Sequence, residues 1–133
     1  CATVGSAWNI VSDGTASNGK YVTVKPGLNS TASAPTGATN FVTISISVPT
    51  NGTYSVFGRV NCPDANGDSF WVSMDGGTWT SLNGLPVGSW QWASFGSFSL
   101  TAGSHSLRIA YREDGAQLDK ISVSGDSRTF PRR

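Results

Sequence analysis

Residues 42–60 read VTISISVPTNGTYSVFGRV, and this stretch predicts the fold. From Val42 to Val48 every second residue is apolar and β-branched, with Thr or Ser between. Strict alternation of this kind is the pattern of a strand with one buried face. The turn residues PTNG follow at 49–52, and alternation resumes from Tyr54 to Val60. We therefore expect two strands with one apolar face each, paired as an antiparallel hairpin.

Similar short segments, rich in β-branched and aromatic residues and bounded by Gly, Pro, Asn or Asp, recur along the whole chain. The further strands expected are Lys20 to Lys25, Asp68 to Asp75, Thr78 to Leu82, Trp90 to Leu100, His105 to Tyr111 and Leu118 to Ser124. Helix signals are nearly absent. About eight short antiparallel strands predict an all-β fold, a jelly-roll β-sandwich of two antiparallel sheets. Residues 25–40 form the one long irregular connection, which we expect to overhang a binding surface.

The length and charge limit the classes of function. With 133 residues, the chain is expected to form one β-sandwich domain over residues 1–125, followed by a C-terminal tail at 126–133. The formal net charge is +1, and the basic residues are scattered apart from three arginines in the tail. Nucleic-acid binding needs clustered cations, and membrane insertion needs a run of about 18 apolar residues, so neither is expected.

Two cysteines, Cys1 and Cys62, predict a disulfide and a secreted, extracellular protein. Two buried thiols are the alternative. The chain opens at Cys1 without Met, which is expected of a processed or excised module.

The chain offers little for catalysis. His105 is the sole histidine and lies at the edge of a turn, so no catalytic triad can be argued, and we expect no enzyme activity. The segment DANGD at 64–68 spaces oxygen ligands as calcium loops do, but turn chemistry explains it as well. Asp119 shares strand parity with Ile121 and Val123 and is expected to point into the core. An inward carboxylate needs a cation or several hydrogen bonds.

The five tryptophans carry more information. Trp90 and Trp92 follow a turn, and their spacing puts both indoles on one face of a strand. Flat aromatic faces stack on sugar rings, and core packing is the alternative for each ring taken singly. Phe57, Arg59 and Trp71 form a second outward group. That group could line a concave sheet face or be covered by the N-terminal segment.

Several segments, in this order, resemble the carbohydrate-binding modules of the β-sandwich group that includes families 6 and 35. These modules are appended to secreted polysaccharide-degrading enzymes. The segments are Asn51 to Val60, Asp68 to Val72, Asp75 to Gly77, Trp90 to Trp92, Ala102 to Gly115 and Leu118 to Ile121.

The resemblance implies a sugar site in the loops at one rim, with Trp92, Trp90 and Tyr21 as stacking residues. Gln117 occupies a polar position where the related modules usually carry Asn. Arg112 alternates with Tyr111 and is expected to point outward, as a donor to sugar hydroxyls or to a carboxylate.

The related modules also hold a structural calcium ion. They bind it through an N-terminal Glu-x-Glu segment and a C-terminal Asp. Asp119 matches the Asp, whereas the chain contains no such Glu pair.

The sequence thus predicts a carbohydrate-binding module that holds a secreted enzyme or a cell surface on poly- or oligosaccharide. The alternative is a structural or adhesive extracellular domain that makes protein contacts or self-assembles. An appended catalytic domain and self-association are the partner arrangements expected beside the glycan.

Overall fold

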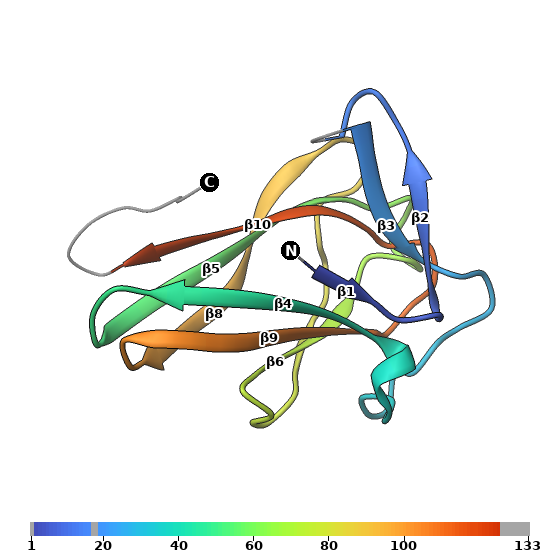
Figure 1. Cartoon of the computed structure of the whole chain (residues 1–133). Helices are drawn as coiled ribbons and strands as arrows, with labels where there is room; N and C mark the ends of the chain where they lie inside the picture. The colour runs from blue at the N-terminus through green and yellow to red at the C-terminus, as the bar shows by residue number, and fades with distance from the viewer. Residues whose placement is uncertain (1, 17–18, 126–133) are drawn as a thin grey trace.

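The computed structural model describes residues 2–16 and 19–125, so Cys1, residues 17–18 and the expected tail at 126–133 lie outside the described residues. Its strands form two five-stranded sheets packed face to face (Figure 1). One sheet has the order β1-β4-β9-β6-β7 and is called the β4 sheet here; the other, β2-β3-β10-β5-β8, is called the β5 sheet. The elements are β1 (Ala2–Val4), β2 (Trp8–Ser12), β3 (Lys20–Val24), the 3-10 turn η2 (Ala38–Asn40), β4 (Phe41–Val48), β5 (Gly52–Asn61), β6 (Phe70–Met74), β7 (Thr80–Leu82), β8 (Gln91–Leu100), β9 (Gly103–Tyr111) and β10 (Gln117–Gly125).

All pairings between these strands are antiparallel, which confirms the predicted β-sandwich. Sequence reasoning missed β1 and β2. The first has only three residues, and the second places its buried Trp8 in a segment without strict alternation. The Trp8 ring stacks on Phe70 of the other sheet at 5.5 Å between centroids, so this N-terminal strand closes one side of the core.

The predicted hairpin between β4 and β5 is wrong. β4 pairs with β1 and β9, whereas β5 pairs with β10 and β8, so the turn at 49–52 crosses from one sheet to the other. Both strands still turn their alternating apolar residues to one core, but from opposite sides. The period of two fixes which face is buried, and it does not distinguish a hairpin within one sheet from an arch between two.

The core lies between the sheets and contains large residues from both. Phe70, Phe95, Leu107 and Ile109 are almost completely buried there. Gly58 on β5 is required for this packing, because a Cβ atom at that position would come within 2.3 Å of the Phe95 ring. The Phe95 ring thereby fills the space that Gly58, which has no side chain, leaves free.

Cys62 differs from the expectation, because it is a free cysteine. It lies within the core, where burial raises the pKa of its thiol to about 11. The expected partner, Cys1, lies outside the described residues, so no disulfide is present in the part that the structure describes.

The long connection at 25–40 runs over the outer face of the β4 sheet. The Ser30 carbonyl accepts a hydrogen bond of 2.8 Å from Nε1 of Trp71 on β6, and Ser30 N donates to the Arg112 carbonyl. Residues 35–38 then pass beside β4 and β9, where they line a hollow. No helix within the described ranges has the length and apolar character needed to cross a membrane.

Candidate functional site

Four of the five residues predicted for a sugar site belong to the outer face of the β5 sheet. Gln117 on β10 pairs with Thr23 of β3 and Asn61 of β5, and Tyr21 lies two residues before Thr23 on the same face. Arg59 of β5 pairs with Trp92 of β8. Residues of the opposite parity, such as Val24 and Val60, are buried in the core, which is why these side chains face outward.

Trp90 lies just before β8 and is fixed on three sides. Its ring meets the ring of Tyr21 edge to face, with 5.4 Å between centroids. The Arg59 guanidinium carbon lies 5.1 Å from the centre of the indole. Indole Nε1 donates a hydrogen bond of 2.9 Å to Oγ1 of Thr15, in the loop between β2 and β3. Trp90 is therefore a partly buried ring that ties this loop to the sheet.

Trp92 has a different environment, although it lies only two residues further on. It is 48% exposed, more than any other tryptophan in the described part of the chain. Lys120 on β10 approaches the ring, with Nζ 5.7 Å from its centre. The exposed indole therefore offers an apolar surface with a positive charge over part of the ring.

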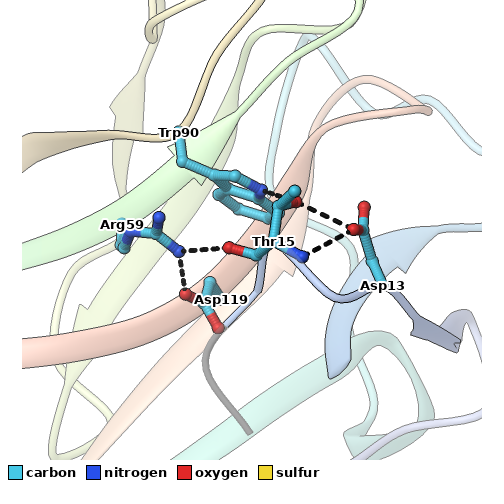
Figure 2. A network of polar contacts seen from close by, with 5 residues as sticks. All are labelled: Asp13, Thr15, Arg59, Trp90 and Asp119. Carbon is cyan, nitrogen blue, oxygen red and sulfur yellow. Dashed lines mark hydrogen bonds and ion pairs between the residues drawn. The ribbon is translucent and has the colours of Figure 1, made fainter. Parts of the chain in front are cut away.

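A polar network under Trp90 joins the β2–β3 loop to the sheet (Figure 2). Arg59 Nη1 donates to the Thr15 carbonyl and forms an ion pair with Asp119. Thr15 N and Oγ1 donate to Oδ1 of Asp13, at 2.9 and 2.8 Å. These two hydrogen bonds, the backbone one first, lower the pKa of Asp13. The loop is thus connected to both the indole and the ion pair.

The position of Asp119 corrects the prediction that it points into the core. The β10 register shifts between Leu118, which faces Val60, and Lys120, which faces Arg59. Asp119 is the additional residue of this β-bulge, so the parity that it shares with Ile121 does not determine its direction. Its side chain is 0% exposed, and it is covered on the outer face, where it meets the 26% exposed Arg59.

Calcium at Asp119 does not fit the residues present. A calcium ion takes six to eight oxygen ligands. Among residues 2–16 and 19–125, no three His, Cys, Asp or Glu side chains gather in a group that could hold a metal. The Asp119 carboxylate already forms an ion pair with the Arg59 guanidinium, and this cation would repel the metal. The segment at 64–68 is a turn, in which Asp64 Oδ1 accepts a hydrogen bond of 2.9 Å from Asn66 N.

A groove of about 470 Å³ adjoins the same face at the end of the sheet. It is lined by Asn9, Thr23, Val24, Pro26, Pro63, Asp64, Asn66, Asp114, Gly115 and Gln117. Asp114 Oδ2 accepts a hydrogen bond of 2.7 Å from Gly27 N, which holds one wall in place. In the described part of the chain, the side-chain amides of Asn9 and Gln117 make no hydrogen bond. They remain available to a ligand.

Arg112 does not join the other predicted site residues. It follows β9 of the other sheet, and its guanidinium carbon lies 5.8 Å from the centre of the Trp71 ring. Its Nη1 lies 4.0 Å from Oε1 of Glu113. The 25–40 connection passes over both residues through Ser30. Arg112 is therefore a packing residue under this connection.

The outward group expected from Phe57, Arg59 and Trp71 is also divided. Phe57 and Arg59 lie on β5, whereas Trp71 lies on β6 of the other sheet. Their outer faces are on opposite sides of the sandwich, so they do not form one patch.

Sequence reasoning missed two residues of the site, Thr15 and Lys120. The segment Asp13-Gly14-Thr15 has the composition of a side-chain-capped turn, which was a usable signal. Nothing in the sequence places Lys120 beside Trp92, since that contact depends on the order of the strands.

No family model and no curated protein matches the sequence. Solved structures do match the fold. A family 35 carbohydrate-binding module from Clostridium thermocellum has a TM-score of 0.69 at 22% identity, over 92% of this chain and 90% of that chain. A second family 35 module, from an environmental isolate, has a TM-score of 0.67 at 16% identity, over 95% and 86%.

A GH26-CBM35 β-(1,4)-mannanase from Podospora anserina matches 100% of this chain with a TM-score of 0.68 at 17% identity. This chain spans 28% of that mannanase, but nearly the whole length of the two separate modules. The protein therefore belongs, by its fold, to the β-sandwich class. Within that class, its fold is that of the family 35 carbohydrate-binding modules.

Proposed function

We propose that this protein is a carbohydrate-binding module that holds an attached enzyme or a cell surface on polysaccharide and binds without turnover. The fold shared with family 35 modules supports this class. The observation that carries the proposal is the exposed indole of Trp92 on a sheet face rich in hydrogen-bonding side chains.

Trp92 is suited to stack on a sugar ring. A pyranose has one face of C–H groups, and an indole with an open face offers that patch an apolar contact while the hydroxyls stay at the ring's margin. At 48% exposure, much of the ring is open. The Lys120 ammonium, which lies over the ring at 5.7 Å from its centre, supplies a donor for a sugar hydroxyl near the indole.

The groove supplies the polar half of the site. Gln117 and Asn9 both offer amides that donate and accept, and Thr23 lies between them in register. Thr23 donates its own hydroxyl to the Ala116 carbonyl at 2.9 Å, so it holds the wall rather than a ligand. A sugar chain that leaves Trp92 would reach Gln117 along the same outer face, across β5 and β10.

Trp90 and Thr15 act as positioning residues in this proposal. The hydrogen bond between them and the ion pair beneath hold the β2–β3 loop against the sheet. A rigid loop reduces the ordering cost of binding, so affinity depends on contacts that do not touch the ligand.

The carboxylates near the site have structural partners, which supports binding without hydrolysis. Asp119 pairs with Arg59, Asp13 accepts from Thr15, and Asp114 accepts from Gly27. A glycosidase needs an acid and a base that both face the glycosidic bond. We therefore expect no release of reducing sugar from any polysaccharide that the protein binds.

Affinity electrophoresis in gels that contain β-1,4-mannan or β-1,3-galactan tests this proposal. Wild-type protein should be retarded by at least one neutral polysaccharide, and Trp92→Ala should weaken the interaction by about 1 to 3 kcal/mol. Ile10→Ala is the matched control, because Ile10 is an exposed apolar residue at the edge of the same sheet and should change nothing. If Trp92→Ala is retarded like wild type, the site is misplaced; if a wide glycan panel gives no binding, the function is wrong.

The finer expectations keep their own tests. Attachment to a catalytic domain is supported by the mannanase that contains this fold, and genomic context or the intact protein would test it. Secretion and a Cys1–Cys62 disulfide are tested by the intact mass of natively exported protein. Calcium is tested by melting with and without EDTA, and self-association by size-exclusion chromatography at several concentrations.

A further inference from the structure

The outer face of the β4 sheet carries a second hollow, on the opposite side of the sandwich from Trp92. Its volume is about 530 Å³, within the size range of small-ligand sites. Its walls come from β4, β9 and the loop before β7, and residues 35–38 of the long connection form its rim. The lining residues are Pro35, Thr36, Gly37, Ala38, Phe41, Thr43, Trp79, Ser106 and Arg108.

Arg108 is the only charged residue of this lining. It lies in the middle of the sheet, in register with Thr43 of β4 on one side and Ser73 of β6 on the other. Within residues 2–16 and 19–125, its guanidinium forms no ion pair and no hydrogen bond. Arg59, by contrast, is paired with Asp119, and Arg112 lies 4.0 Å from Glu113.

An aromatic wall stands beside this guanidinium. The Phe41 and Trp79 rings are in contact, with 5.1 Å between centroids and planes tilted by 46°. The Arg108 guanidinium carbon lies 5.7 Å from the centre of the Phe41 ring. Phe41 is buried, whereas Trp79 is only partly covered. Trp79 is therefore the ring with surface left for a ligand.

The carboxylate closest in sequence to this wall, that of Asp75, already has hydrogen-bond partners. Asp75 lies in the turn after β6, where its Oδ1 accepts a hydrogen bond of 2.8 Å from Ser106 N. Its Oδ2 lies 2.5 Å from Nδ1 of His105. Asp75 therefore does not neutralise Arg108, and the hollow keeps a positive charge next to an apolar wall.

We propose that this hollow is a second ligand site, which takes a sugar ring that bears an oxyanion, either a carboxylate or a sulfate. The assignment rests on the proposed function for the choice of a saccharide. Arg108 would receive the oxyanion through its planar fork of N–H donors, and Trp79 would pack against the ring. The Thr43 hydroxyl, on the neighbouring strand, would be a partner for the sugar hydroxyls.

The charge of Arg108 favours an acidic sugar over a neutral sugar as the ligand of this hollow. A partly covered guanidinium gives up water when a ligand closes the hollow, and that loss is compensated only by an anion or several acceptors. A neutral ring would occlude the charge and leave it without a counterion. An oxyanion supplies the counterion and the acceptors together, so acidic saccharides should be preferred here.

Isothermal titration of the full chain with three probes tests the site: galacturonate trimer, a sulfated carrageenan oligosaccharide and neutral galactotriose. The indole Nε1–H resonances report the location, with the Trp79 signal assigned by its loss in Trp79→Phe. Wild-type protein should bind at least one acidic probe with a shift of the Trp79 signal. Arg108→Gln should weaken that binding about tenfold or more, since a charged pairing is lost.

Lys20→Gln is the matched control, because it removes one positive charge from an exposed residue of the other sheet. It should leave acidic binding within about twofold, whereas Arg108→Lys should recover only part of the loss, since the fork is absent. Carboxylate and sulfate are distinguished by which acidic probe shifts Trp79. The assignment is overturned if neither does so, or if Arg108→Gln and Lys20→Gln bind alike. Failure of the proposed function would instead appear as loss of neutral binding at Trp92, with this site unaffected.

Discussion

The outer faces of the two sheets each place an arginine beside aromatic rings, but the two arginines have different surroundings. Arg59 on the β5 sheet lies over Trp90 and is paired with the buried Asp119. Arg108 on the β4 sheet lies over Phe41 and has no carboxylate partner in the described part of the chain. The difference arises from one β-bulge, which brings an additional carboxylate to the first face. A register shift on the neighbouring strand therefore decides whether an arginine is held in an ion pair or remains available to a ligand.

The largest effect expected from this difference is on stability. Arg59→Gln leaves the fully buried Asp119 without this cation and removes a support of the β2–β3 loop. Breaking a buried pair by removing one partner is costly, and partial exposure of Arg59 reduces the cost to about 2 to 4 kcal/mol of unfolding free energy. Urea denaturation followed by tryptophan fluorescence measures this loss.

Arg108→Gln is the control on the other face. No buried carboxylate depends on Arg108, so the same substitution should change the unfolding free energy by less than about 1 kcal/mol. Equal losses in the two variants would contradict the comparison. A third variant, Asp119→Ala, should destabilise by about 1 to 3 kcal/mol, because it removes the other partner of the pair.

The two indoles of the β5 face make the second comparison. Trp90 has three contacts within the protein, and Trp92 has an exposed ring. Trp90→Ala should lower the unfolding free energy by about 1 to 3 kcal/mol, less than the cost at a fully buried position. Trp92→Ala should leave it within about 0.5 kcal/mol, as for most surface substitutions. Thermal denaturation of both variants, beside their retardation in affinity gels, distinguishes a positioning ring from a binding ring.

Much of the fold could be predicted from the sequence because alternation reports directly on burial. Val42 to Val48 and Tyr54 to Val60 are strands with one core face, as predicted. Their pairing could not be predicted, because a hairpin and an arch between sheets bury the same residues. Both sheets depend on contacts between distant segments, such as β1 with β4. Local signals do not encode these contacts.

The candidate site shows the same limit. Tyr21, Trp90, Trp92 and Gln117 do share one sheet face, whereas the resemblance implied a site in the loops at one rim. Arg112 was misplaced because outward parity does not say on which of two sheets a residue lies. Asp119 was misoriented because a single additional residue in β10 breaks the alternation on which the argument depended.

A smaller effect is expected from the hydroxyl that connects the loop to Trp90. Thr15→Val keeps the shape of the side chain but removes the acceptor for Trp90 Nε1 and a donor to Asp13. Exposed hydrogen bonds contribute modestly, so we expect a loss of about 0.5 to 1.5 kcal/mol in unfolding free energy. Thr15→Ser, which retains the hydroxyl, should recover most of it. Equal stability of Thr15→Val and wild type would mean that the loop is held by its backbone alone.

The smallest effect concerns a pH dependence that only the β4 sheet carries. His105, the single histidine, lies between two acceptors, the Thr101 carbonyl at 2.6 Å from Nε2 and the Asp75 carboxylate at 2.5 Å from Nδ1. These two hydrogen bonds, that to Thr101 first, raise the pKa of His105 above its usual 6.5, because only the protonated ring can donate to both acceptors. Burial raises the pKa of Asp75, but the hydrogen bonds from His105 and Ser106 N and the charge of His105 together lower it below its usual value.

The sign of the effect follows from these two directions. A histidine whose pKa is raised by folding stabilises the protein fully below the unfolded pKa, near 6.5, and this contribution disappears as the pH rises through the folded pKa. The contribution of Asp75 is present above its usual pKa of 3.8 and is lost as the pH falls through its lowered value. The His105–Asp75 pair should therefore stabilise the protein most between the lowered pKa of Asp75 and the raised pKa of His105. The β5 sheet has no histidine and should not respond between about pH 6 and 8.

The resonance of the His105 Cε1 proton measures this directly, since a single histidine needs no assignment by mutation. Its titration midpoint should lie above 6.5 in wild type and move down in Asp75→Asn, which removes the charged acceptor. In thermal melts, the wild-type melting temperature should decline from pH 6 to 8 relative to His105→Gln, and any other group that titrates in this window cancels in the difference. Parallel melting profiles, or a midpoint at the usual value, would show that the hydrogen bonds to Thr101 and Asp75 do not stabilise the protonated ring and that the two sheets respond to pH alike.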